Sequence, residues 1–213
     1  MKLVIFGASG ATGQHLVQQA LVLNHTVTAF ARHPEKILAV PAPGLTTMKG
    51  DVHDAEAVSA AIAGKDAVLS ALGADTLGKS DLLEVGMRHI LAGMAAHGVR
   101  RIVVLGAAGV HKDAVRHQGL AMRMLLTTVS NTILREPFRS QREQERLLEA
   151  SSAEYTIARP PRLLNRPFTG HYRVQLDGLP PGGAQIDRAD VAHFMLRQLT
   201  DATYIRKGPY VAN

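Results

Sequence analysis

Two hydrophobic periods alternate along the chain. Short runs of branched apolar residues, such as Leu3–Phe6, predict buried strands. Longer stretches, such as Ala11–Leu23, place apolar residues three or four positions apart and predict amphipathic helices. Because strands and helices take turns in this way, the sequence predicts an α/β fold in which helices cover a parallel sheet.

The predicted elements extend along the whole chain. Strands are expected at Leu3–Phe6, Thr26–Ala31, Leu45–Lys49, Asp66–Ala71, Arg101–Leu105 and Tyr155–Arg159, with short ones at Tyr172–Leu176 and Ala184–Asp187. Helices are expected at Ala11–Leu23, Asp54–Ala63, from Ser80 or Asp81 to His97, Ala114–Ser130, Arg139–Ala150 and Arg188–Leu199. The chain shows no internal repeat or linker. We therefore expect one doubly wound domain over residues 1–213, with residues 160–185 forming the wall of a pocket.

Composition narrows the possible chemistry. The sequence contains no cysteine, which excludes disulfides, thiolate nucleophiles and cysteine-ligated metals. No His-Glu-x-x-His or similar spacing is present, so we expect no metal. The formal net charge of +6 suits anionic ligands, while an aromatic fraction of 4% without tryptophan argues against single-stranded nucleic acid as a partner.

The beginning of the chain bears on location. No run approaches the roughly 18 apolar residues that a membrane span needs. Leu3–Phe6 is shorter than the roughly 7–15 apolar residues in the core of a signal peptide, and Gly7 ends it as a strand. We expect a cytoplasmic protein.

A glycine-rich loop follows the first strand and opens the first helix. Its sequence is Gly7-Ala8-Ser9-Gly10-Ala11-Thr12-Gly13. Glycines at this spacing permit a sharp turn, close approach of backbone N–H groups to a pyrophosphate, and tight packing of helix on strand. The helix N-terminus adds a partial positive charge. The loop predicts a dinucleotide site, with these candidate contacts: Gly7, Ser9, Gly10, Ala11, Thr12 and Gly13.

The end of the second strand indicates which dinucleotide binds. An acidic residue there usually binds the ribose hydroxyl of NAD, whereas arginine accommodates the 2′-phosphate of NADP. This sequence has Arg32 at that point, and Lys36 adds a second positive charge. We therefore expect a preference for NADP(H), with Asp51 and Val52, after the third strand, meeting the adenine.

A competing motif lies after the fourth strand. Gly73–Ser80 matches the P-loop pattern, with Lys79 in the phosphate-binding position. A P-loop enzyme also needs an acidic residue at the end of a later strand to hold magnesium. The strands ending at Leu105 and Arg159 run into Gly106 and Pro160 instead. We favour a role for Gly73 beside the dinucleotide.

These features together resemble the atypical short-chain dehydrogenases of the NmrA-like branch, and most closely the biliverdin-IXβ reductase and NADPH-dependent flavin reductase family. The likeness extends over nearly the whole chain and is most specific in Phe168–Leu199. It implies an NAD(P)-binding Rossmann fold, a monomer, and cofactor contacts from Leu72, Gly73, Gly106 and Pro160.

The chain departs from that family where the substrate would sit. The family's Thr-Ser pair is replaced by Gly106-Ala107, and the histidine after its double proline is replaced by Arg162. The segment from His111 to Arg139 is also longer. The resemblance therefore carries over the cofactor half of the site but not biliverdin as the substrate.

No Tyr-x-x-x-Lys pair is present, so the usual proton relay for ketones is missing. Its absence favours a flavin, quinone or similar planar acceptor stacked on the nicotinamide, where holding the reacting atoms about 3–3.5 Å apart provides much of the catalysis. Candidate catalytic residues are Arg162, which could steady negative charge, and His111, which could donate a proton. His117 flanks the same region. Arg162 is equally well explained as a surface residue or a phosphate contact.

A second class of function stays open. NmrA-like proteins can sense the NADP(H) redox state without turnover, and a chain lacking the family's Thr-Ser and histidine would suit that role. The arginines of Arg135–Arg146 are offset by Glu136, Glu143 and Glu145, which indicates a solvated helix with spaced ion pairs. Nucleic acid is therefore not an expected partner.

Overall fold

A parallel sheet of six strands forms the centre of the molecule. The computed structural model describes residues 1–38, 42–73, 80–120, 124 and 135–213. The strands are β1 (Lys2–Phe6), β2 (Thr26–Ala31), β3 (Leu45–Lys49), β4 (Ala67–Ser70), β5 (Arg101–Leu105) and β6 (Glu154–Ala158). They lie in the order β3-β2-β1-β4-β5-β6. This is the Rossmann order, and the predicted doubly wound fold is confirmed.

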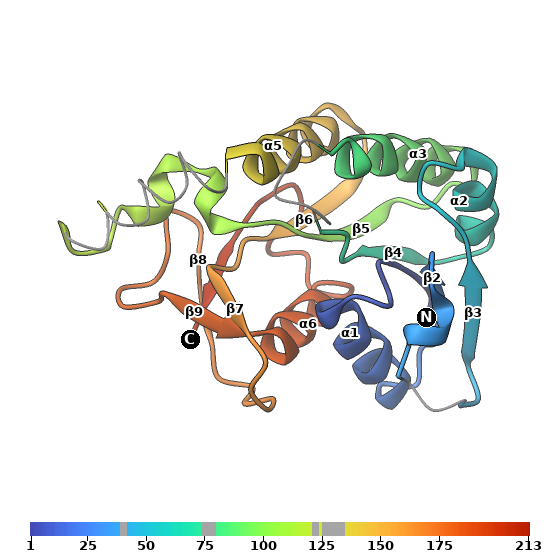
Figure 1. Ribbon diagram of the computed structural model, residues 1–213, viewed down its shortest axis with the longest axis horizontal. Helices are drawn as coiled ribbons and strands as arrows, with labels where there is room; N and C mark the ends of the chain where they lie inside the picture. The colour runs from blue at the N-terminus through green and yellow to red at the C-terminus, as the bar shows by residue number, and fades with distance from the viewer. Residues whose placement is uncertain (39–41, 74–79, 121–123, 125–134) are drawn as a thin grey trace.

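Helices cover both faces of the sheet (Figure 1). One face carries α2 (Ala55–Ile62), α3 (Leu82–Ala96) and α5 (Arg135–Ala150), and the other carries α1 (Ala11–Val22) and α6 (Arg188–Arg197). Successive strand residues point to opposite faces. Leu3 and Ile5 therefore pack with the α1 and α6 side, while Val4 and Phe6 pack with the α2, α3 and α5 side.

Several elements differ from their predicted bounds. Helix α5 begins at Arg135, not Arg139, and α6 ends at Arg197 rather than Leu199. The predicted helix Ala114–Ser130 lies largely outside the described residues, and its beginning overlaps a 3₁₀ turn at Lys112–Val115. Two short strands were not predicted, because each depends on pairing with a strand far along the chain: β7 (Arg162–Leu164) and β10 (Tyr210–Ala212).

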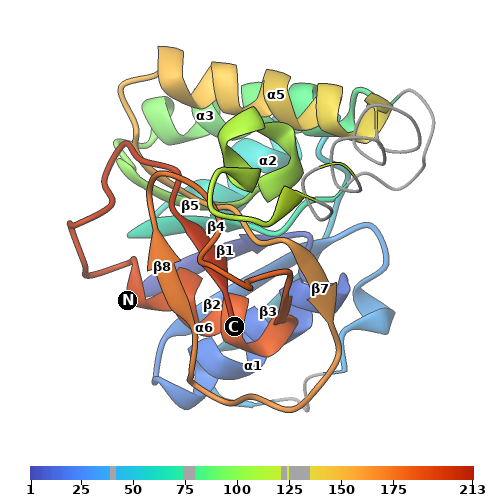
Figure 2. The same ribbon diagram turned by 90° about the vertical axis from the view of Figure 1, so that its left-hand side faces the viewer.

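The C-terminal residues add two small sheets at one end of the molecule. There β7 pairs with β9 (Gln185–Asp187), and β8 (Arg173–Gln175) pairs with β10. In Figure 2, which views the molecule from this end, β7 and β8 lie in front of the main sheet. Residues 160–185 thus include β7 and β8, as expected for an addition to the Rossmann core; their role as a pocket wall stays a prediction.

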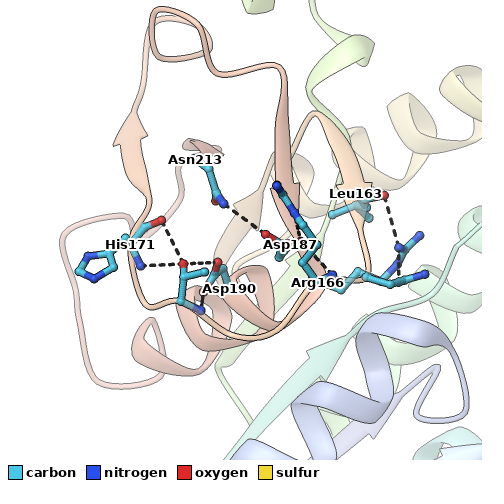
Figure 3. A network of polar contacts seen from close by, with 9 residues as sticks. Leu163, Arg166, His171, Asp187, Asp190 and Asn213 are labelled. Atoms are coloured by element: carbon cyan, nitrogen blue, oxygen red, sulfur yellow. Dashed lines mark hydrogen bonds and ion pairs between the residues drawn. The ribbon is translucent and has the colours of Figure 1, made fainter.

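Two buried carboxylates fasten this addition to α6 (Figure 3). Asp190 accepts hydrogen bonds from the backbone N–H groups of Thr169 and Gly170 at 3.0 and 2.8 Å, and from the Thr169 hydroxyl at 2.7 Å. Asp187 accepts from the Arg166 backbone N–H and Nε. Such charge-assisted bonds are stronger than neutral ones. Within the stretch Phe168–Leu199, where the resemblance is most specific, these bonds therefore hold the segment around Thr169 against the beginning of α6.

Across the residues described, we find no helix long and apolar enough to cross a membrane.

Candidate cofactor and active site

A hollow lies at the carboxyl ends of the central strands. It is next to the point between β1 and β4 where the strand order reverses: β2 and β3 follow on one side of β1, and β4, β5 and β6 follow on the other. Ligands of doubly wound folds bind at this switch point. The cavity measures about 170 Å³. Its lining comes from the end of β2, the loops after β1 to β4 and the first residue of α3: Gly7, Ser9, Gly10, Phe30, Ala31, Arg32, Gly50, Val52, Ala71, Leu72, Gly73 and Leu82. It brings together seven of the residues expected to contact the cofactor: Gly7, Ser9, Gly10, Arg32, Val52, Leu72 and Gly73.

Two glycines of the glycine-rich loop, Gly7 and Gly13, have no room for a side chain. Gly7 has a φ of +75°, and a Cβ there would lie 2.7 Å from the carbonyl oxygen of Ala71. A Cβ on Gly13 would collide with the Gly7 carbonyl. Gly10 caps α1 without a side-chain hydrogen bond to the helix. The first N–H groups of α1 are therefore available for an anion, which is how a pyrophosphate binds in this fold.

The predicted adenine side of the cavity is apolar. A Cβ on Gly50 would overlap the ring of Phe30, so the glycine lets this ring fill the floor. Phe30 packs against Phe6 with ring centroids 5.0 Å apart. Val52 is buried, and its carbonyl oxygen lies 2.8 Å from Nδ1 of His89. Together these contacts form an apolar floor, on which an adenine ring would fit.

Charged groups lie next to lining residues of the cavity on the loops after β2 and β3. Asp51 accepts a hydrogen bond from the backbone N–H of His53 and lies 2.7 Å from its ring Nδ1. These bonds, with a smaller contribution from the positive charge of Arg32, lower the pKa of Asp51. Hydrogen bonds to Asp51 and Asp81 raise the pKa of His53. Arg32 is exposed at the edge of the cavity, as binding of a 2′-phosphate requires.

The other seven predicted contacts are not part of this lining: Ala11, Thr12 and Gly13 in the first turn of α1, Asp51 next to Val52, and Lys36, Gly106 and Pro160. Lys36 is exposed on a 3₁₀ turn, Pro34–Lys36, beyond β2. Gly106 and Pro160 follow β5 and β6, where the Gly106 N–H donates to the Ala158 carbonyl and the Ala108 N–H donates to the Pro160 carbonyl. A dinucleotide running along this edge of the sheet from β2 would reach Gly106 after three strand spacings of about 4.8 Å each.

A charged cluster lies beside Gly106. Glu145, on α5, is 3% exposed, and its Oε2 lies 2.7 Å from Nε2 of His111 and 2.6 Å from a guanidinium nitrogen of Arg159. Burial favours the neutral acid, but the His111 hydrogen bond and the Arg159 charge outweigh it and lower the pKa of Glu145. The sequence interpretation of Glu145 as part of a solvated helix is therefore wrong.

The helical spacing of Glu145 along α5 could have indicated its inward position, but the prediction did not use it. Glu145 shares the inner face of α5 with Gln141, Gln144 and Leu148, which follow helical spacing, and all four are buried. A carboxylate at a core-facing position is costly unless it is paired. Its burial marks it as a candidate functional residue.

The remaining candidates lie elsewhere. Arg162 is exposed at the beginning of β7, opposite Gln185 of β9. His117 lies 3.1 Å from the exposed carboxylate of Asp177 and is not part of the Glu145 cluster. Lys79 and most of the P-loop match, residues 74–79, lie outside the described residues. In the described part of the chain, no cluster of His, Asp and Glu could hold a metal ion.

Solved structures share this fold over the full chain. A short-chain dehydrogenase/reductase of Veillonella parvula DSM 2008, solved in complex with NADP, superposes with a TM-score of 0.81 at 19% identity, covering 100% of this chain and 94% of that one. ChuY of Escherichia coli O157:H7, described as an anaerobilin reductase, gives 0.78 at 22% identity, covering 100% and 97%. The likeness to reductases of the short-chain dehydrogenase type is thus confirmed at the level of the fold.

Sequence comparison adds a relative and a family. The 2-alkyl-3-oxoalkanoate reductase of Stenotrophomonas maltophilia (strain K279a) is 29% identical over 218 residues, which cover 92% of this chain and 64% of the relative. This chain therefore spans less than two thirds of that protein. The family model for NAD(P)H-binding proteins matches residues 7–202, nearly all of the chain. The chain belongs to this NAD(P)H-binding family.

Proposed function

We propose that the protein is an NADPH-dependent reductase of a flavin or a similar planar acceptor. The observation that carries the proposal is Arg32, placed at the edge of the cavity at the end of β2 in a member of an NAD(P)H-binding family. Arginine at this point of the fold suits the 2′-phosphate that distinguishes NADPH from NADH. When bound, the nicotinamide supplies the hydride.

The chain's own residues would bind and orient the reactants. Gly7, Gly10 and Gly13 let the backbone approach the pyrophosphate, and the N-terminus of α1, which has no side-chain cap, stabilises its charge. Phe30 and Val52 would contact the adenine. Gly106 leaves the β5 end without a side chain where the nicotinamide is expected, so that a flat acceptor could stack there. Arg162 is a candidate for holding a negatively charged part of that acceptor.

The nature of the acceptor rests on what the sequence lacks. Tyr155 and Tyr172 are followed four residues later by Arg159 and Leu176, so neither begins a Tyr-x-x-x-Lys pair. Planar acceptors such as flavins and quinones depend mainly on close stacking against the donor carbon. The two reductases found by comparison are described as acting on other compounds, and both substrate types belong in the test.

The decisive measurement is oxidation of NADPH, and separately NADH, followed at 340 nm. The acceptor panel contains FMN, riboflavin, menadione, biliverdin, anaerobilin and a 2-alkyl-3-oxoalkanoate. We expect faster oxidation of NADPH than NADH, with a flavin or quinone as the best acceptor. Preference for the oxoalkanoate would contradict the planar acceptor but keep the reductase. Rates equal to the enzyme-free rate throughout, together with tight NADPH binding, would instead support a redox sensor.

A further inference from the structure

The cluster beside Gly106 contains a histidine held by a buried carboxylate. Nε2 of His111 bonds to Oε2 of Glu145, whose side chain is 4% exposed, while the His111 side chain is 29% exposed. The ring therefore has one edge against the protein and another toward solvent. This arrangement fixes the orientation of the imidazole, as a carboxylate does for other catalytic histidines.

The cluster lies at the end of the sheet where the nicotinamide is expected. A Cβ on Gly106 would lie 3.4 Å from Oε1 of Glu145, so this oxygen borders the residue that follows β5. Oε1 is buried and has no hydrogen-bond partner among the residues that the structure describes. His111 itself ends the 3₁₀ turn Ala108–Val110, four residues beyond Ala107. Both groups thus lie beside the expected site of the acceptor.

The charges around the pair leave His111 as the group suited to exchange a proton. Arg159 balances the Glu145 carboxylate, with its guanidinium nitrogen 2.6 Å from Oε2. The Arg159 guanidinium also lies over the ring of Tyr210, 5.7 Å from its centre, and the Tyr210 hydroxyl donates to Asp113. Burial is the main reason why the pKa of Tyr210 lies far above its usual range, so Tyr210 remains neutral.

Resting on the proposed reductase function, we propose that His111 donates the proton that accompanies hydride transfer and that Glu145 is its positioning residue. The acceptor gains a hydride from NADPH and a proton from Nδ1 of the His111 imidazolium, so that NADPH and one proton convert the acceptor to its two-electron-reduced form and NADP⁺. The neutral ring keeps its Nε2–H bond to Glu145 and regains a proton from water at its exposed edge.

The first test measures His111 in the protein without cofactor. The titration of each histidine ring is followed by NMR, and His111 and His117 are assigned from the signals lost in His111→Gln and His117→Gln. Glu145→Gln should move the His111 midpoint about one pH unit lower, because the carboxylate is lost and the Arg159 charge is left unbalanced. The matched variant Asp177→Asn, which alters the exposed His117–Asp177 pair, should leave the His111 midpoint unchanged. An unmoved midpoint in Glu145→Gln would overturn the pairing.

The second test measures turnover with menadione, which takes up a hydride and a proton, and with FMN. His111→Gln should lower kcat by about 100- to 10,000-fold while the NADPH dissociation constant, measured by fluorescence, stays unchanged. His117→Gln should keep the rate of the unmodified protein. In the unmodified protein, kcat should fall as the pH rises through the His111 midpoint. In Glu145→Gln this fall should occur at lower pH. Glu145→Asp, which retains the charge, should recover part of the rate.

The outcomes separate the two proposals. If the unmodified protein reduces none of the acceptors, the reductase function fails and proton donation fails with it. If it reduces an acceptor and His111→Gln is as fast as His117→Gln, proton donation fails while the reductase function stands. If Glu145→Gln slows turnover without moving the pH profile, Glu145 has a structural role, and its assignment as the positioning residue is overturned.

Discussion

The neighbours of Gly106 leave no room for a side chain at this position. The family that the chain resembles has a threonine there, but a Cβ at Gly106 would lie 2.7 Å from Cγ2 of Ile157 and 3.4 Å from Oε1 of Glu145. A larger side chain would therefore force Ile157 or Glu145 to move. Glycine at this position is compatible with a buried carboxylate beside the β5 end.

Arg32 should determine which cofactor binds. We expect Arg32→Gln to weaken NADPH binding by about 10- to 100-fold, because each hydrogen bond between charged groups contributes about 1.5–3 kcal/mol. NADH lacks the 2′-phosphate and should bind nearly as before. Fluorescence titration of both cofactors tests this, with Arg146→Gln, an exposed arginine on α5, as the control. Equal weakening of both cofactors would show that Arg32 does not contact the 2′-phosphate.

Glu145 should make stability depend on pH at the acidic end. Its folded-state pKa is lowered, since the His111 bond and the Arg159 charge outweigh burial. Its ionisation therefore stabilises the fold above the unfolded pKa near 4.5, and this contribution is lost as the pH falls through the folded value. Glu145→Gln should lower the free energy of unfolding by about 3 kcal/mol at pH 7. Urea unfolding should show this deficit shrinking below about pH 4; a deficit independent of pH would contradict the assignment.

Elements of secondary structure were predicted where periodicity is strong. The six main strands are found within one residue of their expected bounds. Five of them, such as Leu3–Phe6, are mostly buried and rich in apolar residues, whereas Leu45–Lys49 is more polar and more exposed. Of the residues predicted to bind the cofactor, Gly7, Ser9, Gly10 and Arg32 line the cavity, and their contact with a cofactor stays a prediction. The sequence analysis missed β7, β10 and the inward position of Glu145, because these depend on partners far along the chain. Phe30 was missed because it reads as an ordinary strand residue.

Helix α2 should depend on its cap more than α3 does. Asp54 accepts hydrogen bonds from the N–H groups of Glu56 and Ala57, both at 3.0 Å, whereas Asp81 caps α3 without a side-chain bond to the helix. Asp54→Ala should lower the free energy of unfolding by about 1 kcal/mol. Asp81→Ala, which loses an exposed contact with His53, should lower it by less than about 0.5 kcal/mol. Equal losses in urea unfolding would contradict the assigned caps.

At the scale of the whole molecule, the expected cofactor path connects parts that are distant in sequence. The cavity is built from loops after β1 to β4, whereas Gly106, Glu145 and Arg159 belong to the β5 and β6 end. The C-terminal addition is held to α6 by Asp187 and Asp190. A ligand that spans this edge would contact loops from both halves of the sheet and stabilise the native state relative to the unfolded chain.

Thermal unfolding with added nucleotides should therefore separate the dinucleotide site from the P-loop interpretation. At a hundred times its dissociation constant, a ligand stabilises the native state by about 2.7 kcal/mol, which raises the Tm of a chain this long by about 5–10 °C. We expect this rise with NADPH, a smaller one with NADH at the same concentration, and none with magnesium and ATP. In Arg32→Gln the advantage of NADPH over NADH should disappear. A rise with ATP that Lys79→Ala abolishes would instead identify Gly73–Ser80 as a P-loop, because the lysine of that motif binds the terminal phosphates.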